Sequence, residues 1–478
     1  MKNLRTLLRS HSAVCLLRVG LCFGLTSAVY LSWLDRLIRF AGGPVADWVS
    51  MNAGYLLQAA GIGLVCFLLR SRQDPSPHRL FSLSLLAFAA VSVPALLADS
   101  AAGVIGFGLA VNLFCGIIAG FYLDAVGRTV AAGRRAVVFG GGYALGTVAV
   151  GLLALIGQGS LLHSRGALLL YLPLSAAAAF FVSRPRPLSA GAAPSPAPAD
   201  RPASLLLAGS VVFLLSTVKN LGFSFPSADV ETGLLPELTR LPYAIGLLAA
   251  GLIHTRSRRD GALCTVAALV LPFLMLGLTS EPVPAAICWG LDYLFFGFFS
   301  VFRVVLFLDL AEQARRPFLA PLGLLFGRLG DVAGTAAGLL LSGRKVLLIL
   351  LTLLLFFPTV WLFYRLWQRL YEPHAVQQRS EREVFEAFCL HHDLSAREKE
   401  VLRMVLDSHS NGEIAEALFI TESTVKYHVR NVLQKVGCRN RVELQKKYTL
   451  TLYPQMAGEL QAAEASDRII PIDSAYRA

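Results

Sequence analysis

Long apolar runs recur along most of this chain of 478 residues and limit what it can fold into. About 20 apolar residues are enough to cross a bilayer as an α-helix, and about twelve runs approach or exceed that length. Because 55% of the residues are hydrophobic, 15% are charged and the mean hydropathy is +0.59, a soluble fold of this size is excluded. The runs lie at 13–34, 51–69, 80–98, 102–123, 136–156, 166–183, 203–221, 236–254, 261–280, 284–309, 317–341 and 345–367.

Basic residues between the runs predict the orientation. With the N-terminus inside, the cytoplasmic loops hold Lys2, Arg5, Arg9, Arg70, Arg72, Arg79, Arg128, Arg134, Arg135, Arg184, Arg186, Arg201, Arg256, Arg258, Arg259, Arg315, Arg316, Arg365 and Arg369. The opposite loops hold only Arg36, Arg39, Arg165, Arg240, Arg344 and Lys345. The positive-inside rule therefore places both termini in the cytoplasm. The first run is longer than the apolar core of a signal peptide and lacks a small-residue cleavage site, so we expect an uncleaved span.

Residues 184–202 form a Pro/Ala-rich linker that divides the runs into six plus six. This layout resembles the major facilitator superfamily, whose two six-span halves are related by an axis along the membrane normal. Gly120, Asp124, Gly127 and Arg128 resemble the loop signature of that superfamily. They follow the fourth run, whereas the superfamily carries the signature after its second span.

A polar helical module follows the last run, at Leu394 to Tyr448. Ser395 with Glu398 and Ser410 with Glu413 have the spacing of capping boxes, which start helices near 396 and 411. Thr421 is a good N-cap for a third helix, Gly437 can end it, and Asn440 can cap a fourth. The order helix, helix, tight turn, helix places the later helix in a DNA major groove.

The third helix of this module has two different sides. At roughly 100° per residue, one side is a buried apolar seam. It holds Val425, Val429, Val432, Leu433 and Val436. The opposite side is the candidate reading face, and it holds Ser423, Lys426, Tyr427, Arg430 and Gln434. Lys and Arg donate to guanine O6 and N7, while Tyr427 offers its ring to a thymine methyl or its hydroxyl to a phosphate. The alternative for such side chains is an ordinary solvated face.

The module resembles the LuxR/FixJ-type helix-turn-helix domain of bacterial transcription regulators. The matching residues are Leu394, Ser395, Arg397, Glu398, Glu400, Val401, Leu402, Asn411, Glu413, Ile414, Ala415, Leu418, Ile420, Thr424, Val425, Lys426, His428, Lys435 and Arg441. Ser408 stands where the family usually has Gly, which would alter the first turn, and Gly412 replaces a usual polar residue. The resemblance implies double-stranded DNA as a partner and a homodimer formed through the fourth helix.

The basic residues of the module gather between Thr421 and Lys447, as phosphate binding requires. Together, the pattern and the resemblance assign DNA contacts to Thr424, Lys426, Tyr427, His428, Arg430, Gln434, Lys435 and Arg441.

Ionisable residues inside the apolar runs are costly in a bilayer and are usually functional or paired. Six of those in the second half stand out, namely Lys219, Asp292, Arg303, Asp309, Arg328 and Asp331. Arg328 and Asp331 are three residues apart and can pair on one helix face. We interpret the set as a ligand-sensing group that faces an interior cavity, with structural neutralisation as the alternative. The aromatic run Tyr293 to Phe299 is expected to pack or face lipid rather than to line a pocket.

No nucleophile-base pair, Cys/His ligand spacing or Gly-rich phosphate loop is present, so we expect no enzyme, cofactor or metal site. The predicted domains are a membrane half at 1–183, a linker at 184–202, a membrane half at 203–369, a juxtamembrane linker at 370–393, the helix-turn-helix domain at 394–448 and a loose tail at 449–478. The predicted fold class is all-α, a polytopic helix bundle followed by a small four-helix domain.

The functional hypothesis is a one-component regulator in the inner membrane, surrounded by lipid, whose membrane part senses an unidentified small molecule. A transporter with an appended DNA-binding domain is the first alternative, and a degenerate interaction module is the second. About 25 residues join the two parts and span at most roughly 80 Å when extended, so DNA would be bound close to the membrane.

Overall fold

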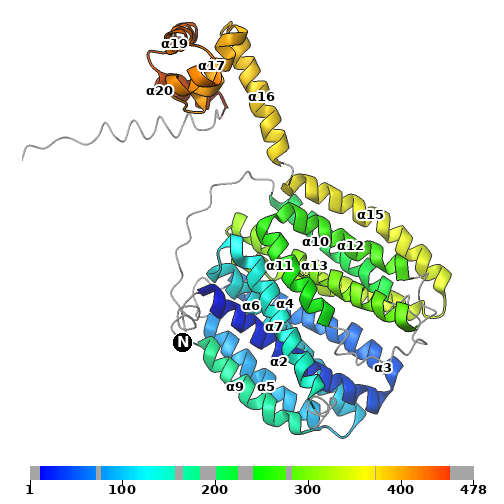
Figure 1. The fold of residues 1–478 in the computed structure, drawn as a ribbon. Helices are drawn as coiled ribbons and strands as arrows, with labels where there is room; N and C mark the ends of the chain where they lie inside the picture. The colour runs from blue at the N-terminus through cyan, green and yellow to red at the C-terminus, as the bar shows by residue number, and fades with distance from the viewer. Residues whose placement is uncertain are drawn as a thin grey trace, which may run out of the picture. The chain divides into compact units, whose positions relative to one another are not determined.

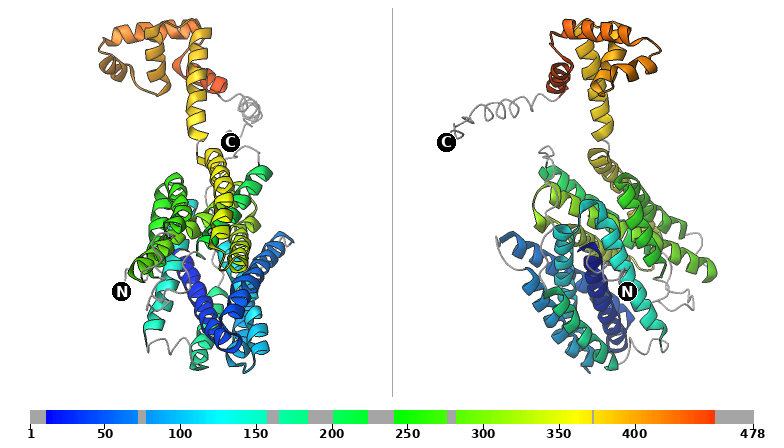
Figure 2. Two further views of the ribbon diagram at one scale, coloured as in Figure 1. Left: turned by 90° about the vertical axis from the view of Figure 1, so that its right-hand side faces the viewer. Right: turned by 60° about the vertical axis from the view of Figure 1, so that its left-hand side comes forward.

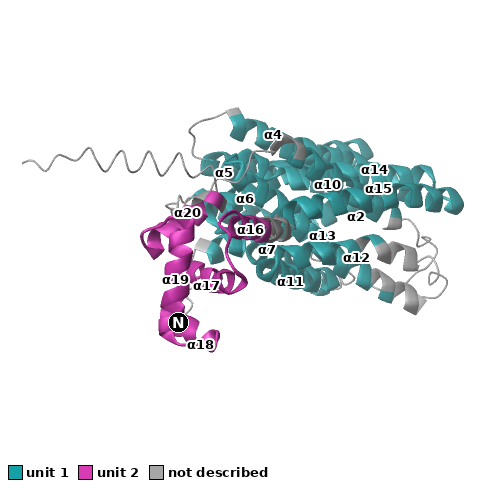
Figure 3. Ribbon diagram, turned by 90° about the horizontal axis from the view of Figure 1, so that it is seen from above, with its two compact units in different colours: residues 1–371 teal, residues 372–478 magenta. Residues whose placement is uncertain are grey.

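The computed structural model describes residues 11–71, 77–156, 165–183, 201–223, 241–275, 282–371 and 373–452. The chain forms two compact units, unit 1 at Met1–Tyr371 and unit 2 at Glu372–Ala478 (Figure 3). Within the described ranges every regular element is a helix, which confirms the all-α fold class. The Pro/Ala-rich linker up to residue 200 and the predicted tail beyond residue 452 lie outside these ranges.

Unit 1 is a bundle of long apolar helices (Figure 1). Its first six segments are α2 (His11–Ala41), α3 (Gly43–Asp47) continuing through the π-helix η1 (Trp48–Gly54) into α4 (Tyr55–Ser71), α5 (Pro77–Leu97), α6 (Ala101–Thr129), α7 (Arg135–Leu155) and α9 (Leu168–Ser183). The next six are α10 (Arg201–Phe223), α11 (Leu241–Arg256), α12 (Arg258–Met275), α13 (Pro282–Gln313), α14 (Leu322–Leu340) and α15 (Lys345–Tyr371). Short 3-10 turns lie at Ala132–Arg134, Arg165–Ala167 and Pro317–Leu319.

The described part of each predicted apolar run lies mainly on one of these segments, and residues 236–240 and 276–280 of two runs lie outside the described ranges. Among the described residues, nine helices are long and apolar enough to cross a membrane. The helix α11 has only 16 residues, and α14 carries Arg328 and Asp331. Both nevertheless pack inside the bundle, α11 on α7 and α14 on α10. The four residues that resemble the superfamily's loop signature lie within α6, which is the fourth segment. The structure therefore agrees with the sequence count, which places them on the fourth segment rather than after the second.

Helix packing in unit 1 repeats with a shift of six segments. In the first half α2 packs on α7, α4 on α6, and α5 on both α6 and α9. In the second half the equivalent pairs are α10 on α14, α11 on α13, and α12 on both α13 and α15. The halves meet at two contacts, α4 on α14 and α7 on α11. Replacing each helix of one contact by its equivalent in the other half gives the other contact. Two views in Figure 2 show the halves as blue-to-cyan and green-to-yellow bundles.

Glycines allow the closest helix crossings in both halves. A Cβ atom on Gly61 of α4 would come within 3.0 Å of the carbonyl oxygen of Leu113 of α6. In the equivalent crossing of the second half, a Cβ atom on Gly246 of α11 would collide in the same way with the carbonyl oxygen of Leu294 of α13. Small residues at helix contacts are typical of membrane bundles, where close backbone approach provides the packing energy.

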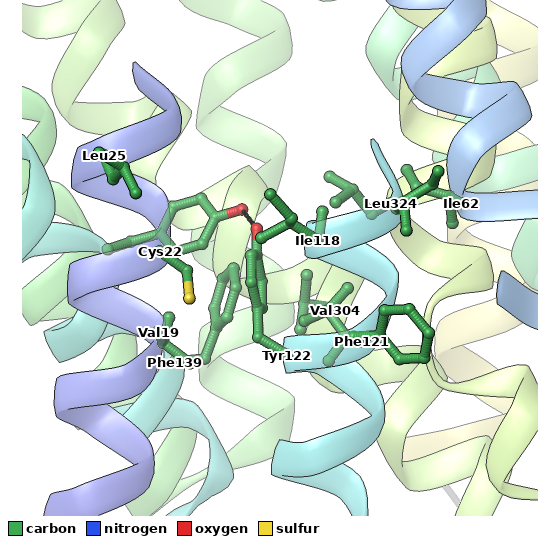
Figure 4. Packing of buried hydrophobic residues seen from close by; sticks show 14 of the residues in the cluster. Val19, Cys22, Leu25, Ile62, Ile118, Phe121, Tyr122, Phe139, Val304 and Leu324 are labelled. Carbon is green, nitrogen blue, oxygen red and sulfur yellow. Dashed lines mark hydrogen bonds between the residues drawn. The ribbon is translucent and has the colours of Figure 1, made fainter. Parts of the chain in front are cut away.

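The largest buried cluster of unit 1 lies between α2, α6, α7 and α13. Figure 4 shows Val19 and Cys22 of α2 near Phe139 of α7 and Tyr122 of α6. The hydroxyl groups of Tyr122 and Tyr143 form a hydrogen bond within this cluster, which satisfies two buried polar atoms.

Unit 2 consists of α16 (Pro373–His391), α17 (Ala396–Leu406), α18 (Asn411–Ala417), α19 (Glu422–Val436) and α20 (Arg441–Leu452). Its helix ends confirm the signals in the sequence. Both capping boxes form, Thr421 caps α19, and Gly437 ends α19 with φ 73°. The side chain of Asn440 accepts a hydrogen bond at 2.8 Å from the Glu443 amide at the start of α20.

Two further features of unit 2 bear on the sequence predictions. The helix α16 occupies most of the predicted juxtamembrane linker, and Phe385 and Phe388 on it are buried in the core of unit 2. Ser408 adopts φ 65°, the left-handed conformation that glycine adopts easily, so the turn after α17 is retained despite the substitution. The hydroxyl of Ser408 lies 3.3 Å from Nε2 of Gln445, which donates to it and offsets part of the strain.

The glycine crossings generate a testable expectation. Gly246→Ala should force α11 and α13 apart and destabilise the bundle by about 1–3 kcal/mol, the usual cost of overpacking. Gly106→Ala in α6 is the matched control, because nothing lies within 4 Å of a Cβ atom there. Thermal unfolding in a neutral detergent measures both. Equal midpoints for the two variants would contradict the packing scheme.

Candidate nucleic-acid interface and membrane cavity

A cavity of about 450 Å³ lies between the two halves of unit 1. Residues of α2, α4, α6 and α7 from the first half line it together with residues of α10, α11, α13 and α14 from the second. It extends toward the end of the bundle marked by Asp47, Gly151 and Leu339, which we call the mouth end. Because the segments alternate in direction, the opposite end carries the start of α7 and the end of α13.

The carboxylate of Asp331 on α14 organises one wall of the cavity. It is 1% exposed. Its Oδ1 accepts hydrogen bonds from Lys219 Nζ at 3.3 Å, from Asn220 Nδ2 at 2.5 Å and from the hydroxyl of Ser216. Its Oδ2 accepts from Arg328 Nη1 at 3.1 Å, which confirms the predicted pairing along α14.

Arg303 of α13 reaches the same carboxylate less closely. Its Nη1 lies 3.9 Å from Oδ2 of Asp331, and its guanidinium lies 5.1 Å from the ring centroid of Phe299. Among the described residues, Nε and Nη1 of Arg303 and Nε of Arg328 are buried and have no hydrogen-bond partner. The structure therefore brings together Lys219, Arg303, Arg328 and Asp331 from the predicted set.

Asp309 does not belong to this cluster, which corrects its assignment. It lies near the end of α13, where its Oδ2 accepts a hydrogen bond at 2.9 Å from Nε of Arg258 at the start of α12. Arg135 at the start of α7 donates to Oε2 of Glu312 at 2.7 Å and lies 3.8 Å from Oδ1 of Asp309. These residues join the two halves opposite the mouth end, and we call them the ion-pair end.

Asp292 borders the charged cluster at Lys219, whose ammonium interacts electrostatically with the Asp292 carboxylate. It is buried on α13, about three turns from Arg303, and is not among the residues that line the cavity. The aromatic run after it is divided: Tyr293 and Phe296 line the cavity, whereas Phe298 and Phe299 are buried in the helix packing. The expectation that this run only packs or faces lipid is therefore wrong for two of its residues.

In unit 2, α19 presents the two sides that its sequence predicts. Val425, Val432 and Val436 are 2% exposed or less. Val429 and Leu433 are half-buried against the same core. The side chains of the opposite side, Ser423, Lys426, Tyr427, Arg430 and Gln434, are all exposed, and Tyr427 is 62% exposed. The basic and aromatic face is thus free to meet another molecule.

Two of the residues assigned to DNA contact also make hydrogen bonds within the domain. Nζ of Lys435 donates to Oε2 of Glu398 at 2.7 Å and to the carbonyl oxygen of Asp393 at 2.8 Å. Arg441 donates to the carbonyl oxygen of His409 and so ties α20 to the turn before α18. Burial alone would raise the pKa of the Glu398 carboxyl, but the hydrogen bonds from Lys435 and from the Ser395 amide outweigh it and lower that pKa.

Thr424 and His428 are half-buried beside the reading face. The hydroxyl of Thr424 shares a hydrogen bond of 2.8 Å with that of Thr421, the cap of α19. Nδ1 of His428 is buried without a hydrogen-bond partner among the described residues, and its ring packs 5.6 Å from that of Tyr427. The geometry favours a supporting role for both residues.

Comparison with known proteins agrees with this helix arrangement. Residues 392–447 match the family of bacterial regulatory proteins described as the luxR family. They form a luxR-family helix-turn-helix domain. The chain is 50% identical over 52 residues to the transcriptional regulatory protein DegU of Brevibacillus brevis, which is 11% of this chain and 22% of that protein. It is 46% identical over 50 residues, 10% of this chain, to the CsgBAC operon transcriptional regulatory protein of Escherichia coli K12.

The luxR-type domain is the part that these relatives share with the chain, which spans less than a quarter of either of them. A solved structure covers most of the rest. The human organic anion transporter MFSD10 (TETRAN) matches with a TM-score of 0.55 and 18% identity, over 74% of this chain and 99% of that one. At this identity the similarity shows the fold alone, and unit 1 has a major facilitator fold.

The Lys435 contacts generate a prediction for the luxR-type domain. Lys435→Met leaves the buried Glu398 without its cation and should lower the free energy of unfolding of residues 372–478 by about 1–3 kcal/mol at neutral pH. In the wild type the lowered pKa contributes stability that is lost as the pH falls below about 4.3, the ordinary value for Glu. The variant lacks that contribution at neutral pH, so it should lose less on acidification.

Lys426→Met is the control, because Lys426 is exposed and pairs only with the exposed Glu422 at 3.6 Å. Its unfolding free energy should stay within about 0.5 kcal/mol of the wild type. Urea unfolding followed by circular dichroism gives both values. Equal stability of the two variants would show that the contacts of Lys435 with Glu398 do not stabilise the domain.

Proposed function

We propose that this protein is a membrane-embedded one-component transcription regulator, in which unit 1 senses a signal and the luxR-type domain binds promoter DNA. The observation that carries the proposal is the joining, in one chain, of an exposed basic helix face to a major facilitator fold with a charged cavity. The sequence before the luxR-type domain offers no receiver-like polar segment, so the input comes through the membrane part.

The reading face of α19 supplies the DNA contacts. Lys426 and Arg430 donate to guanine edges in the major groove, Tyr427 contacts a thymine methyl or a phosphate, and Gln434 lies further along the same side. Lys435 and Arg441 act indirectly, by holding α19 and α20 in place. The luxR family binds DNA and commonly dimerises. Val442 on α20 is 72% exposed, and we place it in the contact between two copies.

We place the ion-pair end of unit 1 in the cytoplasm of a bacterial cell and the mouth end on the opposite side of the inner membrane. The support is the positive-inside rule, since Arg135 and Arg258 belong to the basic loops of one side. The helix α16 has 19 residues and is therefore about 28 Å long, so the luxR-type domain stays close to the membrane when it binds DNA.

The ion-pair end is the element through which the cavity acts on the luxR-type domain. A ligand that binds one arrangement of the two halves better than another shifts their equilibrium. We propose that the contacts of Arg135 with Glu312 and Asp309 belong to only one of these arrangements. Next to them, the guanidinium of Arg259 lies 4.9 Å from the ring of Trp367 on α15, the last segment before the luxR-type domain.

DNA binding is tested by the double variant Lys426→Ala with Arg430→Ala. Losing two groove contacts should reduce promoter occupancy in cells at least tenfold, because each such contact is worth about 1–3 kcal/mol. Genome-wide chromatin immunoprecipitation measures occupancy and names the regulated promoters. The single variant Arg39→Ala, at an exposed arginine of the mouth end, serves as the control. Unchanged occupancy in the double variant would show that the reading face is misassigned.

Signalling through the ion-pair end is tested by Glu312→Gln and by Arg135→Met. Each removes one half of a contact between the two halves of unit 1 and should change promoter occupancy at least twofold at equal protein levels. Asp35→Asn, at the mouth end, is a matched control because its partner Arg39 lies on the same helix at 2.6 Å. If both ion-pair variants kept the promoter occupancy of the wild type, the ion-pair end would not carry the signal.

The alternative is a transporter with an appended regulatory domain. It is favoured by the cavity between two halves, and the named structural neighbour is itself a transporter. Uptake into vesicles separates the two ideas, since uptake that is lost in Asp292→Asn or Arg303→Met supports transport.

A further inference from the structure

The charges that line the cavity do not balance. Its positive side chains are Lys219, Arg303 and Arg328, and its negative ones are Asp331 and Asp47. Asp47 lies at the mouth end, next to η1, away from the cluster. Among the described residues, Asp331 is the carboxylate that pairs with both arginines, Asp292 lies near Lys219 alone of the three cations, and the oxygens of Asp331 already accept hydrogen bonds from four side chains.

The guanidinium groups lack acceptors on the side of the cavity. Arg303 is 2% exposed, yet its Nε and Nη1 have no hydrogen-bond partner among the described residues, and neither has Nε of Arg328. A buried donor without an acceptor costs about 1–3 kcal/mol, and more when it is charged. On α13, Asp292 lies about three turns away from Arg303 and Asp309 is bound to Arg258 at the ion-pair end, so neither can serve. An acceptor that carries negative charge would satisfy both the donors and the charge.

The surrounding helices hold the guanidinium groups of Arg303 and Arg328 in place. A Cβ atom on Gly327 of α14 would come within 3.0 Å of Nη1 of Arg303, so glycine at this position lets the guanidinium lie against the helix. The guanidinium of Arg328 lies 4.6 Å from the ring centroid of Tyr55 of α4. Both arginines are thus held by their surroundings rather than free to turn toward solvent.

The remainder of the lining is mixed, and its largest side chains are aromatic. Tyr122, Tyr143 and Tyr243 from three helices line the cavity with Phe296. Such rings favour a flat apolar body over an extended alkyl chain, and a volume of about 450 Å³ is in the range of small-molecule sites. The site therefore combines a cationic end with aromatic walls.

We propose that the cavity binds a small aromatic anion, with its carboxylate or phosphate oxygens on Arg303 and Arg328 and its ring among the tyrosines. Lys219 completes the positive end while it remains tied to Asp331. As the input signal of the regulator this ligand rests on the proposed function, but its binding to the cavity does not.

Charge-matched probes test the binding on the full-length protein in a neutral detergent. 2-Naphthoate and phenyl phosphate are the anions, 2-naphthamide is the neutral analogue of the first, and 2-naphthylmethylamine is its cationic analogue. Tryptophan fluorescence and thermal shift report binding. We expect 2-naphthoate to bind the wild type at least tenfold more tightly than 2-naphthamide and the amine not to bind. Equal binding of 2-naphthoate and 2-naphthamide, or no binding of either anion, would overturn the proposal.

Single substitutions show which arginines cause the preference for 2-naphthoate over 2-naphthamide. Arg303→Met and Arg328→Gln should each reduce the preference for 2-naphthoate over 2-naphthamide to near unity, while Arg303→Lys retains part of it. Arg39→Met, an exposed arginine at the mouth end, should leave it unchanged. An unchanged preference in both Arg303→Met and Arg328→Gln would place the anion elsewhere.

Promoter occupancy, measured in parallel, separates this proposal from the regulator itself. Anion binding with no DNA occupancy contradicts the regulator and supports the site. DNA occupancy in a protein that binds no anion does the opposite.

Discussion

The buried carboxylate of Asp331 is the contact on which the membrane part most depends. It receives hydrogen bonds from α10 and from its own helix, and it faces Arg303 of α13, so three helices of the second half meet at one charge. Removing one partner of a buried ion pair is strongly destabilising because the other charge remains uncompensated. The cluster is nevertheless incomplete, since it gathers more positive than negative charge. That imbalance gives the cavity a chemical preference.

We propose that a chain of elements with distinct roles links the cavity to the reading face. The cavity lies between two halves that pack by the same pattern, which is the arrangement that permits one half to move against the other. The ion-pair end joins the halves opposite the mouth, and α15 runs next to it. In unit 2, Lys435 and Glu398 fix α19 against α17, so the side chains for which we propose DNA contacts stand on a fixed helix. We assign sensing, coupling and reading to these three places.

Much of the fold follows from local chemistry that a sequence displays. Capping boxes at Ser395 and Ser410, the stop at Gly437 and the valine seam of α19 depend on residues close in the chain, and the structure confirms each of them. Apolar runs predict membrane helices for the same reason. What escaped prediction depends on residues far apart: Asp309 meets Arg258 from another helix, and Lys435 meets Glu398 across the domain. Lys435 borders the buried seam, but its spacing alone cannot distinguish a phosphate contact from an internal ion pair. The glycine crossings were likewise invisible, because a glycine acquires its meaning from the backbone opposite it.

The most direct test of the account asks whether the cavity controls the reading face. Promoter occupancy of the full-length protein should be measured by chromatin immunoprecipitation in the growth conditions that give its highest and lowest values, with Arg303→Met compared with the wild type at equal protein levels. The account predicts that the difference between the two conditions disappears in the variant, although its α19 is intact. A difference as large as that of the wild type would contradict it.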